Sequence, residues 1–177
     1  MSLLEPSLGI SPPLAELSPD GNKVLSGSSD GTMKIWDAKT ADCLITSRPP
    51  PPPHCVSVDL TIHTVIGLPR NPDVFVVGGK CNTVFCVNIQ GQTTKTMSTG
   101  KREGGDIVAC TVSPRGEWVY ALGEDGVCYC FSVATGKLEH LLPGVHAKDA
   151  GLGCAHHPHR GLVATWGADG NLNLWGV

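Results

Sequence analysis

The sequence predicts an all-β protein built from about four similar units of four antiparallel strands. The first observation behind this prediction is a repeat, whose clearest copies align without a gap: SPDGNKVLSGSSDGTMKIWD (18–37), SPRGEWVYALGEDGVCYCFS (113–132) and HPHRGLVATWGADGNLNLWG (157–176). A fainter copy, PRNPDVFVVGGKCNTVFCVN (69–88), lies between the first two. The second observation is that each copy has two short apolar or alternating runs on either side of a turn, which is the pattern of a β-hairpin.

A third and a fourth strand are predicted around each hairpin. The copies are followed by the segments DCLITS, QTTKTMST and KLEHLL, and preceded by IHTVIGL, IVACTVS and GLGCAHH. Four short strands in about 40 to 45 residues, with an end that resembles Trp-Asp, are typical of one blade of a β-propeller. The predicted organisation is an irregular segment at 1–13 and propeller blades over 14–177, with a proline-rich loop at 47–54.

The composition fits a soluble intracellular protein. Of the 177 residues, 41% are apolar and 16% are charged, and the net charge of -3 provides no broad basic field for nucleic acid or an anionic membrane. We find neither a secretory signal nor a run of about 18 apolar residues that could span a bilayer. The eight cysteines lie mainly in apolar runs, so we expect reduced thiols that pack in the core.

The repeat resembles the WD40 repeat family over about residues 14 to 177. In that family a His, a Ser or Thr, an Asp and a Trp form a polar tetrad within many blades. The resemblance implies a complete tetrad in the last copy, a partial one in the first and a single member in the third: His146, Thr165, Asp169 and Trp175; Ser26, Asp30 and Trp36; and Asp125. The second copy has no counterpart, so we expect that blade to depend on apolar packing.

Some motifs are more specific than the repeat. GKREGGD, SPRGEW, TGKLE and HHPH, within residues 98–175, resemble the C-terminal blades of the Smu-type (suppressor of mec and unc) family of WD40 pre-mRNA splicing factors. The resemblance implies a non-catalytic nuclear scaffold that assembles with spliceosomal proteins, including a RED-type protein, and contacts RNA only indirectly. It implies neither a cofactor nor a membrane association.

The resemblance also sets an expectation about the shape. The family's propeller has seven blades and follows helical N-terminal segments, whereas about four blades and no such helices are predicted here. We therefore expect an incomplete part of a seven-bladed ring, with open strand edges at both ends. Unpaired edges readily pair with other chains, so self-association through these edges is predicted.

The proline-rich loop leaves two interpretations open. It contains Arg48 followed by Pro49, Pro50, Pro51, Pro52 and Pro53. Consecutive prolines adopt the extended polyproline II conformation. The loop is either a stiff insertion that crosses the rim or a ligand for a WW, SH3 or EVH1 type domain. The second interpretation would make the chain a cytoplasmic WD40 adaptor.

Charged residues in a loop before the third copy are candidates for partner binding. The candidate residues are Lys101, Arg102, Glu103 and Asp106, with Arg115 and Glu117 as less certain neighbours. A patch of mixed sign suits a specific protein contact, whereas RNA phosphates favour uniformly basic charge. A propeller that binds RNA directly is a further alternative, but it requires a Lys/Arg stripe that this composition does not show.

The sequence predicts neither a metal site nor catalytic residues. Five histidines lie within twenty residues, beside Cys154, but they lack the paired spacing of metal ligands, and Pro158 places HHPH in a turn. Asp30, Asp125 and Asp169 already belong to the turns of the repeat, and GKREGGD is not a phosphate-binding loop. We therefore expect a binding protein and no enzyme.

Overall fold

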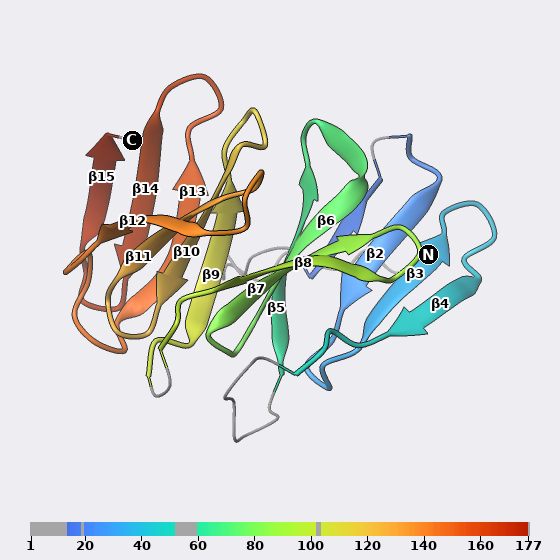
Figure 1. Cartoon of the computed structure of the whole chain (residues 1–177), viewed down its shortest axis with the longest axis horizontal. Helices are drawn as coiled ribbons and strands as arrows, with labels where there is room; N and C mark the ends of the chain where they lie inside the picture. Colours follow the sequence, from blue (N-terminus) through green and yellow to red (C-terminus); the bar gives the residue numbers. More distant parts are fainter. Residues whose placement is uncertain (1–13, 19, 52–59, 102–103, 177) are drawn as a thin grey trace.

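The computed structural model describes residues 14–18, 20–51, 60–101 and 104–176, in which the chain forms strands and turns (Figure 1). The first sheet contains β1 (Ala15–Leu17), β2 (Lys23–Gly27), β3 (Met33–Asp37) and β4 (Cys43–Ser47). The second contains β5 (Ile62–Leu68), β6 (Asn71–Gly79), β7 (Thr83–Asn88) and β8 (Thr93–Ser98). The third contains β9 (Ile107–Val112), β10 (Trp118–Gly123), β11 (Cys128–Ser132) and β12 (Leu138–Leu142), and the fourth β13 (Gly151–His156), β14 (Leu162–Gly167) and β15 (Leu172–Gly176).

The predicted all-β class and the repeated antiparallel sheets are confirmed. Within each sheet the strands pair in chain order, and every pairing is antiparallel. Three sheets have four strands, and the fourth has three among the described residues. The segment 1–13, expected to be irregular, lies outside the described residues.

The sheets follow one another in chain order, from the first at the right of Figure 1 to the fourth at the left. Their first strands β1, β5, β9 and β13 are neighbours in that order. His63 joins two of these strands, because its Nε2–H donates to the carbonyl oxygen of Ile107 at 2.8 Å, while its Nδ1 lies 2.8 Å from Thr64 Oγ1. Burial lowers the pKa of His63, so the neutral imidazole is favoured at this junction.

Three apolar cores lie between successive sheets. Alternate residues of a strand point to opposite faces, so the middle sheets contribute to two cores each. Val77 of β6 packs against the first sheet, and Val76 packs against the third. Tyr129 of β11 likewise faces the second sheet, whereas Cys128 and Cys130 both face the fourth. These two thiols therefore share one packed face, as their spacing predicted.

Tight turns connect the second and third strands of each sheet. Gly126, between β10 and β11, has φ +73, and a Cβ added there would lie 2.1 Å from the carbonyl oxygen of His146. Val145 N–H also donates to Gly126 O at 2.9 Å. The turn therefore contacts the loop before β13 so closely that only glycine fits.

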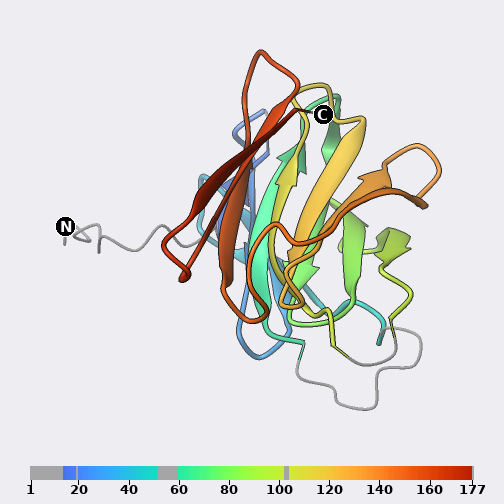
Figure 2. The same cartoon turned by 90° about the vertical axis from the view of Figure 1, so that its left-hand side faces the viewer.

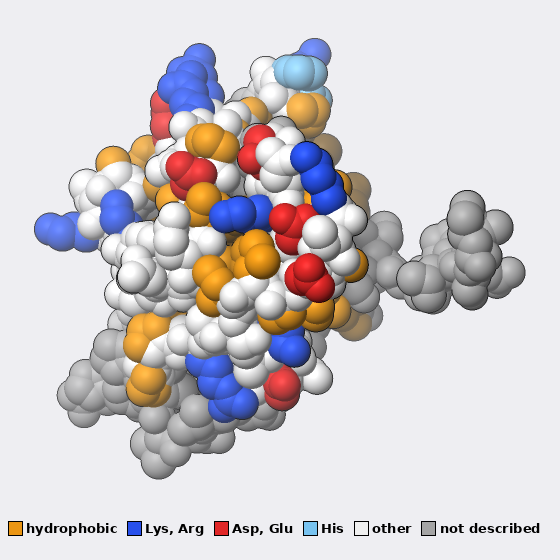
Figure 3. All heavy atoms as spheres, turned by 90° about the vertical axis from the view of Figure 1, so that its right-hand side faces the viewer, with side chains coloured by type: hydrophobic (Ala, Val, Ile, Leu, Met, Phe, Trp, Pro, Cys, Tyr) orange, Lys and Arg blue, Asp and Glu red, His pale blue; other side chains and the backbone are white. Residues whose placement is uncertain are grey.

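The two ends of the row of sheets expose apolar side chains. In the fourth sheet, which faces the viewer in Figure 2, Leu172 is 67% exposed and Leu174 60%. At the opposite end Leu14 and Leu17 are exposed. Figure 3, which views this end, shows small apolar groups between charged side chains. Self-association through these ends stays a prediction.

Two further findings concern the thiols and the membrane. The seven cysteines in the described part of the chain are all free, and six of them are buried. Burial raises the pKa of Cys86 to about 11, which keeps this thiol protonated. None of the described residues belongs to a helix long and apolar enough to cross a membrane.

Candidate protein-interaction site

Hydrogen bonds join the four tetrad residues expected in the fourth sheet. His146 Nδ1 lies 3.0 Å from the Asp169 carboxylate, and its Nε2 lies 3.1 Å from Thr165 Oγ1. Trp175 Nε1 donates to the same threonine oxygen at 3.0 Å. A carboxylate only accepts, so Nδ1 carries the proton, and the threonine hydroxyl donates to Nε2. A neutral histidine thus satisfies the whole chain of hydrogen bonds.

Asp169 is held in its ionised form. The backbone N–H of Asn171 is the main cause that lowers the pKa of Asp169 to about 2, and the His146 side chain adds to it. The Asp169 carboxylate thereby connects the β14–β15 turn to the loop before β13.

The partial tetrad in the first sheet has separate contacts. Trp36 Nε1 donates to Ser26 Oγ at 2.8 Å. Asp30 instead accepts hydrogen bonds from the hydroxyl and the N–H of Thr32, which lower its pKa to about 2. The structure therefore pairs Ser26 with Trp36 and leaves Asp30 in its own turn.

In the third sheet a different hydrogen-bond network surrounds Asp125, the single tetrad residue expected there. Asp125 accepts hydrogen bonds from the Tyr129 hydroxyl at 2.6 Å and from Lys101 Nζ, with which it also forms an ion pair. Burial alone would raise the pKa of Asp125, but these two hydrogen bonds hold it below its usual value. Asn82 Nδ2 donates to the Lys101 carbonyl oxygen at 2.6 Å and fixes the lysine from the second sheet.

In the second sheet the equivalent positions are apolar. Val77, Cys81 and Val87 occupy them and are buried in the core shared with the first sheet. At these three described positions the sheet is held by apolar packing.

The structure does not bring together the four candidate partner-binding residues that it describes. Lys101 and Asp106 lie before β9, whereas Arg115 and Glu117 lie after it. The six residues of β9 separate the two groups by about 20 Å, so they belong to opposite faces of the molecule (Figure 1). Arg102 and Glu103 lie outside the described residues. Lys101 is engaged with Asp125, so its charge is partly neutralised within its own sheet.

Only part of the proline-rich loop can be placed. Arg48, Pro50 and Pro51 are exposed, and Pro49 is buried. Pro52 and Pro53 lie outside the described residues. A buried Pro49 is unavailable to a partner domain, which favours the interpretation as a stiff insertion.

Arg115 and Glu117 belong to a turn between β9 and β10, here called the Arg115 turn (113–117). The buried Ser113 Oγ accepts hydrogen bonds from the N–H groups of Glu117 at 3.1 Å and Trp118 at 3.0 Å. Ser18 Oγ accepts from Lys23 N–H at 3.0 Å at the same position of the first copy. The serine of the repeat thus closes this turn and fixes its backbone.

The equivalent turn of the fourth sheet, here called the histidine turn (157–161), is closed by a histidine. His157 Nδ1 accepts hydrogen bonds from the N–H groups of His159 at 3.0 Å and Arg160 at 3.1 Å. His156 Nδ1–H donates to the His157 carbonyl oxygen at 2.7 Å, and His156 N–H donates to Thr111 Oγ1 of β9 at 3.2 Å. The last contact fixes the histidine turn relative to the third sheet.

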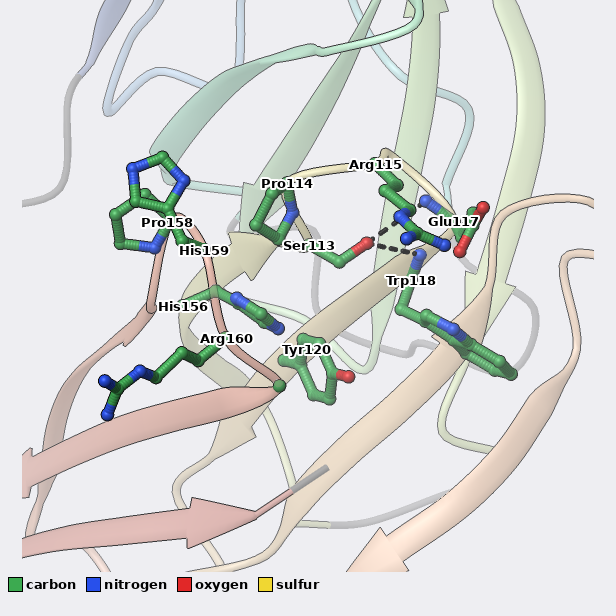
Figure 4. A pocket seen from close by; sticks show the side chains of 11 residues that line it. Ser113, Pro114, Arg115, Glu117, Trp118, Tyr120, His156, Pro158, His159 and Arg160 are labelled. Atoms are coloured by element: carbon green, nitrogen blue, oxygen red, sulfur yellow. Dashed lines mark hydrogen bonds between the residues drawn. The ribbon is translucent and has the colours of Figure 1, made fainter.

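A groove of about 540 Å³ lies between these two turns, and we call it the inter-sheet groove (Figure 4). Tyr120 and His156 lie in its middle, with ring centroids 5.5 Å apart, and Trp118 lies beside them. Tyr120 is only 4% exposed, and burial raises the pKa of its hydroxyl, which keeps the proton. The floor is therefore aromatic, with Tyr120 closely packed and protonated.

The rim of the inter-sheet groove is rich in arginine. Arg115 and Arg160 are exposed on the two turns, and neither guanidinium group has a side-chain partner among the described residues. Glu117 forms an ion pair with Arg70 of the second sheet at 3.7 Å. Three of the chain's five arginines thus lie at or beside this groove.

Sequence reasoning identified Arg115 and Glu117 as candidates but did not consider the histidine turn, which lines the same groove. A signal was present, because SPRGE and HPHRG occupy the same columns of consecutive copies. In a row of sheets, equivalent turns of neighbours lie side by side. Among the described residues no cluster of three or more His, Cys, Asp or Glu could hold a metal ion.

Comparisons with known proteins agree with this architecture. The family model for the WD domain, G-beta repeat, matches residues 14–37. The chain is also 35% identical over 159 residues to the WD40 repeat-containing protein smu1 of Dictyostelium discoideum, an alignment that covers 88% of this chain and 28% of that protein. The chain therefore resembles WD40 repeat proteins over most of its length. Its sheets are WD40 propeller blades.

Other similar proteins have lower sequence identity to this chain. The chain is 26% identical over 159 residues to autophagy-related protein 16 of Arabidopsis thaliana, with 85% of this chain and 30% of that protein aligned. The structure is similar to the beta-propeller domain of Cps50 (Swd1) from Myceliophteria thermophila, with a TM-score of 0.76 at 20% identity over 92% of this chain and 53% of that chain. This structural likeness shows the propeller fold. The chain spans less than a third of the length of smu1 and less than a third of the length of autophagy-related protein 16.

Proposed function

We propose that this WD40 chain is a non-catalytic protein-interaction scaffold in pre-mRNA splicing, and that it works in the nucleus. The observation that carries the proposal is the 35% identity to smu1 over 88% of the chain. The motifs GKREGGD, SPRGEW, TGKLE and HHPH support it, because they resemble the Smu-type splicing factors in particular.

The geometry of the molecule supports binding and not chemistry. Rigid blades hold several turns at each face, and such surfaces bind proteins without covalent steps. The inter-sheet groove offers Trp and Arg side chains, which are residue types enriched at energetic hot spots of protein interfaces. By resemblance, the expected partners are spliceosomal proteins that include a RED-type protein, and contact with RNA is indirect.

Affinity purification tests this proposal. The tagged chain would be incubated with nuclear and with cytoplasmic extract, and the bound proteins identified by mass spectrometry. We expect splicing proteins from the nuclear extract, and we expect them to persist after ribonuclease treatment because the contacts are with protein. Recovery of cytoplasmic signalling proteins alone would contradict the splicing role and favour the adaptor.

The chain offers a control for the site within this experiment. Arg115→Glu and Arg160→Glu change the charge of the inter-sheet groove, and Lys39→Glu makes the same change in an exposed turn of the first sheet on the same face. Loss of partners in the groove variants alone would assign the contact to the groove. Equal recovery with all variants would place the contact elsewhere on the propeller.

A further inference from the structure

We propose that the inter-sheet groove binds an extended acidic segment of a partner protein, whose carboxylates pair with Arg115 and Arg160. This inference rests on the proposed scaffold function and specifies the chemistry of the partner. It assigns a ligand class to the face of the propeller opposite the Lys101 end of β9.

Charge is the first argument. The whole chain carries a net charge of -3, yet the groove collects Arg115 and Arg160 on its two sides, with Arg70 beside it. The single carboxylate on the rim, Glu117, is paired with Arg70, and both side chains are more than half exposed. An exposed ion pair contributes little stability, so an incoming carboxylate can compete with Glu117 for Arg70.

The kind of cation is the second argument. The residues that line the groove include arginine and no lysine. A guanidinium group donates in a planar fork that matches a carboxylate with two parallel hydrogen bonds. Because Arg115 and Arg160 have no side-chain partner within the described part of the chain, their donors are available to a ligand.

Tyr120, at the middle of the groove floor, provides no stacking surface for RNA bases. Single-stranded RNA is bound largely by stacking of bases on exposed aromatic faces. Tyr120 is 4% exposed, and its ring is already packed against His156, so no base can stack on it. A volume of about 540 Å³ lies in the range of pockets that bind compact groups, such as a few side chains of a peptide.

Preorganisation is the final argument. Ser113 Oγ and His157 Nδ1 each accept two backbone hydrogen bonds, which fix the Arg115 turn and the histidine turn before any ligand arrives. His156 N–H also bonds to Thr111, which limits the relative motion of the two turns. A ligand therefore orders only the arginine side chains, which lowers the entropic cost of binding.

Direct binding to the purified chain tests the inference. Fluorescence anisotropy would compare a decapeptide of alternating Glu and Ala, a matched peptide of Gln and Ala, and single-stranded oligouridylate. We expect the Glu peptide to bind more than about tenfold tighter than the Gln peptide at low ionic strength, and to weaken as salt is added. Arg115→Glu and Arg160→Glu should each weaken it by about tenfold, whereas Lys39→Glu should not.

The outcomes separate this inference from the proposed function. Equal affinity for the Glu and Gln peptides, no binding of either, or unchanged binding by both arginine variants would overturn the acidic ligand. Tighter binding of oligouridylate would overturn it in favour of nucleic acid. The scaffold proposal depends on the extract experiment and survives all of these results. Melting curves of the variants, whose changes lie on the surface, check that they are folded.

Discussion

Replacement of Thr165 by Val tests the hydrogen-bond chain of the fourth blade. Valine has nearly the shape of threonine and suits a strand, so the change removes the hydroxyl and little else. Thr165 is 0% exposed and His146 is 6% exposed, so the imidazole Nε2 would lose its partner where water has little access. A buried group left unsatisfied costs about 1–3 kcal/mol, and the partly exposed N–H of Trp175 adds about 0.5–1.5 kcal/mol.

The expected loss is therefore about 2–4 kcal/mol in the free energy of unfolding, or a fall in Tm of roughly 10 °C for a chain of this size. Urea unfolding followed by tryptophan fluorescence would measure it, with Thr165→Ser as the variant that keeps the hydroxyl. Ser26→Ala removes a single, partly exposed hydrogen bond to Trp36 and should cost only about 1 kcal/mol. If Thr165→Val costs no more than Ser26→Ala, the buried hydrogen-bond chain does not stabilise the blade.

Three other perturbations test contacts between and within blades. Gly126→Ala should destabilise the chain by several kcal/mol more than Gly100→Ala. Both glycines have positive φ, but a Cβ at Gly126 would meet a backbone carbonyl oxygen, whereas a Cβ at Gly100 would face open space. Thermal melts of the two variants compare the effects. Lys101→Glu should lower the urea midpoint more than Lys148→Glu, because it places a glutamate beside the Asp125 carboxylate. Lys148 is an exposed lysine on the same face and serves as the control. Equal midpoints would show that the Lys101–Asp125 ion pair is unimportant for stability. Burial lowers the pKa of His63, which predicts a pH effect on stability. The unfolded chain protonates this imidazole near pH 6.5, whereas the folded chain does so only at lower pH. The stability contribution is therefore fully present above pH 6.5 and is lost as the pH falls toward the folded pKa. His63→Gln should make the urea midpoint depend less on pH across this range. If the pH dependence stays the same in the variant, His63 is not its cause.

The sequence predicted what lies within each blade. Apolar alternation and the turn residues specify which strands pair, and the second and third strands of every copy occur where expected. The same alternation placed Cys128 and Cys130 on one packed face. These features depend on neighbours in the chain, which a repeat alignment shows directly.

Contacts between blades were harder to predict. Nothing in the spacing shows that Lys101 reaches Asp125 and Tyr129, because neither lysine nor tyrosine belongs to the tetrad pattern. The hypothesis that one surface joins Lys101 to Arg115 treated closeness in the sequence as closeness in space. A β-strand is extended, so the six residues of β9 take the chain from one face of the propeller to the other.

The length of β9 has a consequence for assembly. Ligands bound at its two ends would be about 20 Å apart and would share no side chain, so they would not compete for the same surface. A partner held at the Lys101 end could remain in place while a second one arrives at the inter-sheet groove or leaves it. Such a molecule can bridge two proteins in either order of arrival, and substitutions at one end would abolish one of its interactions while leaving the other intact.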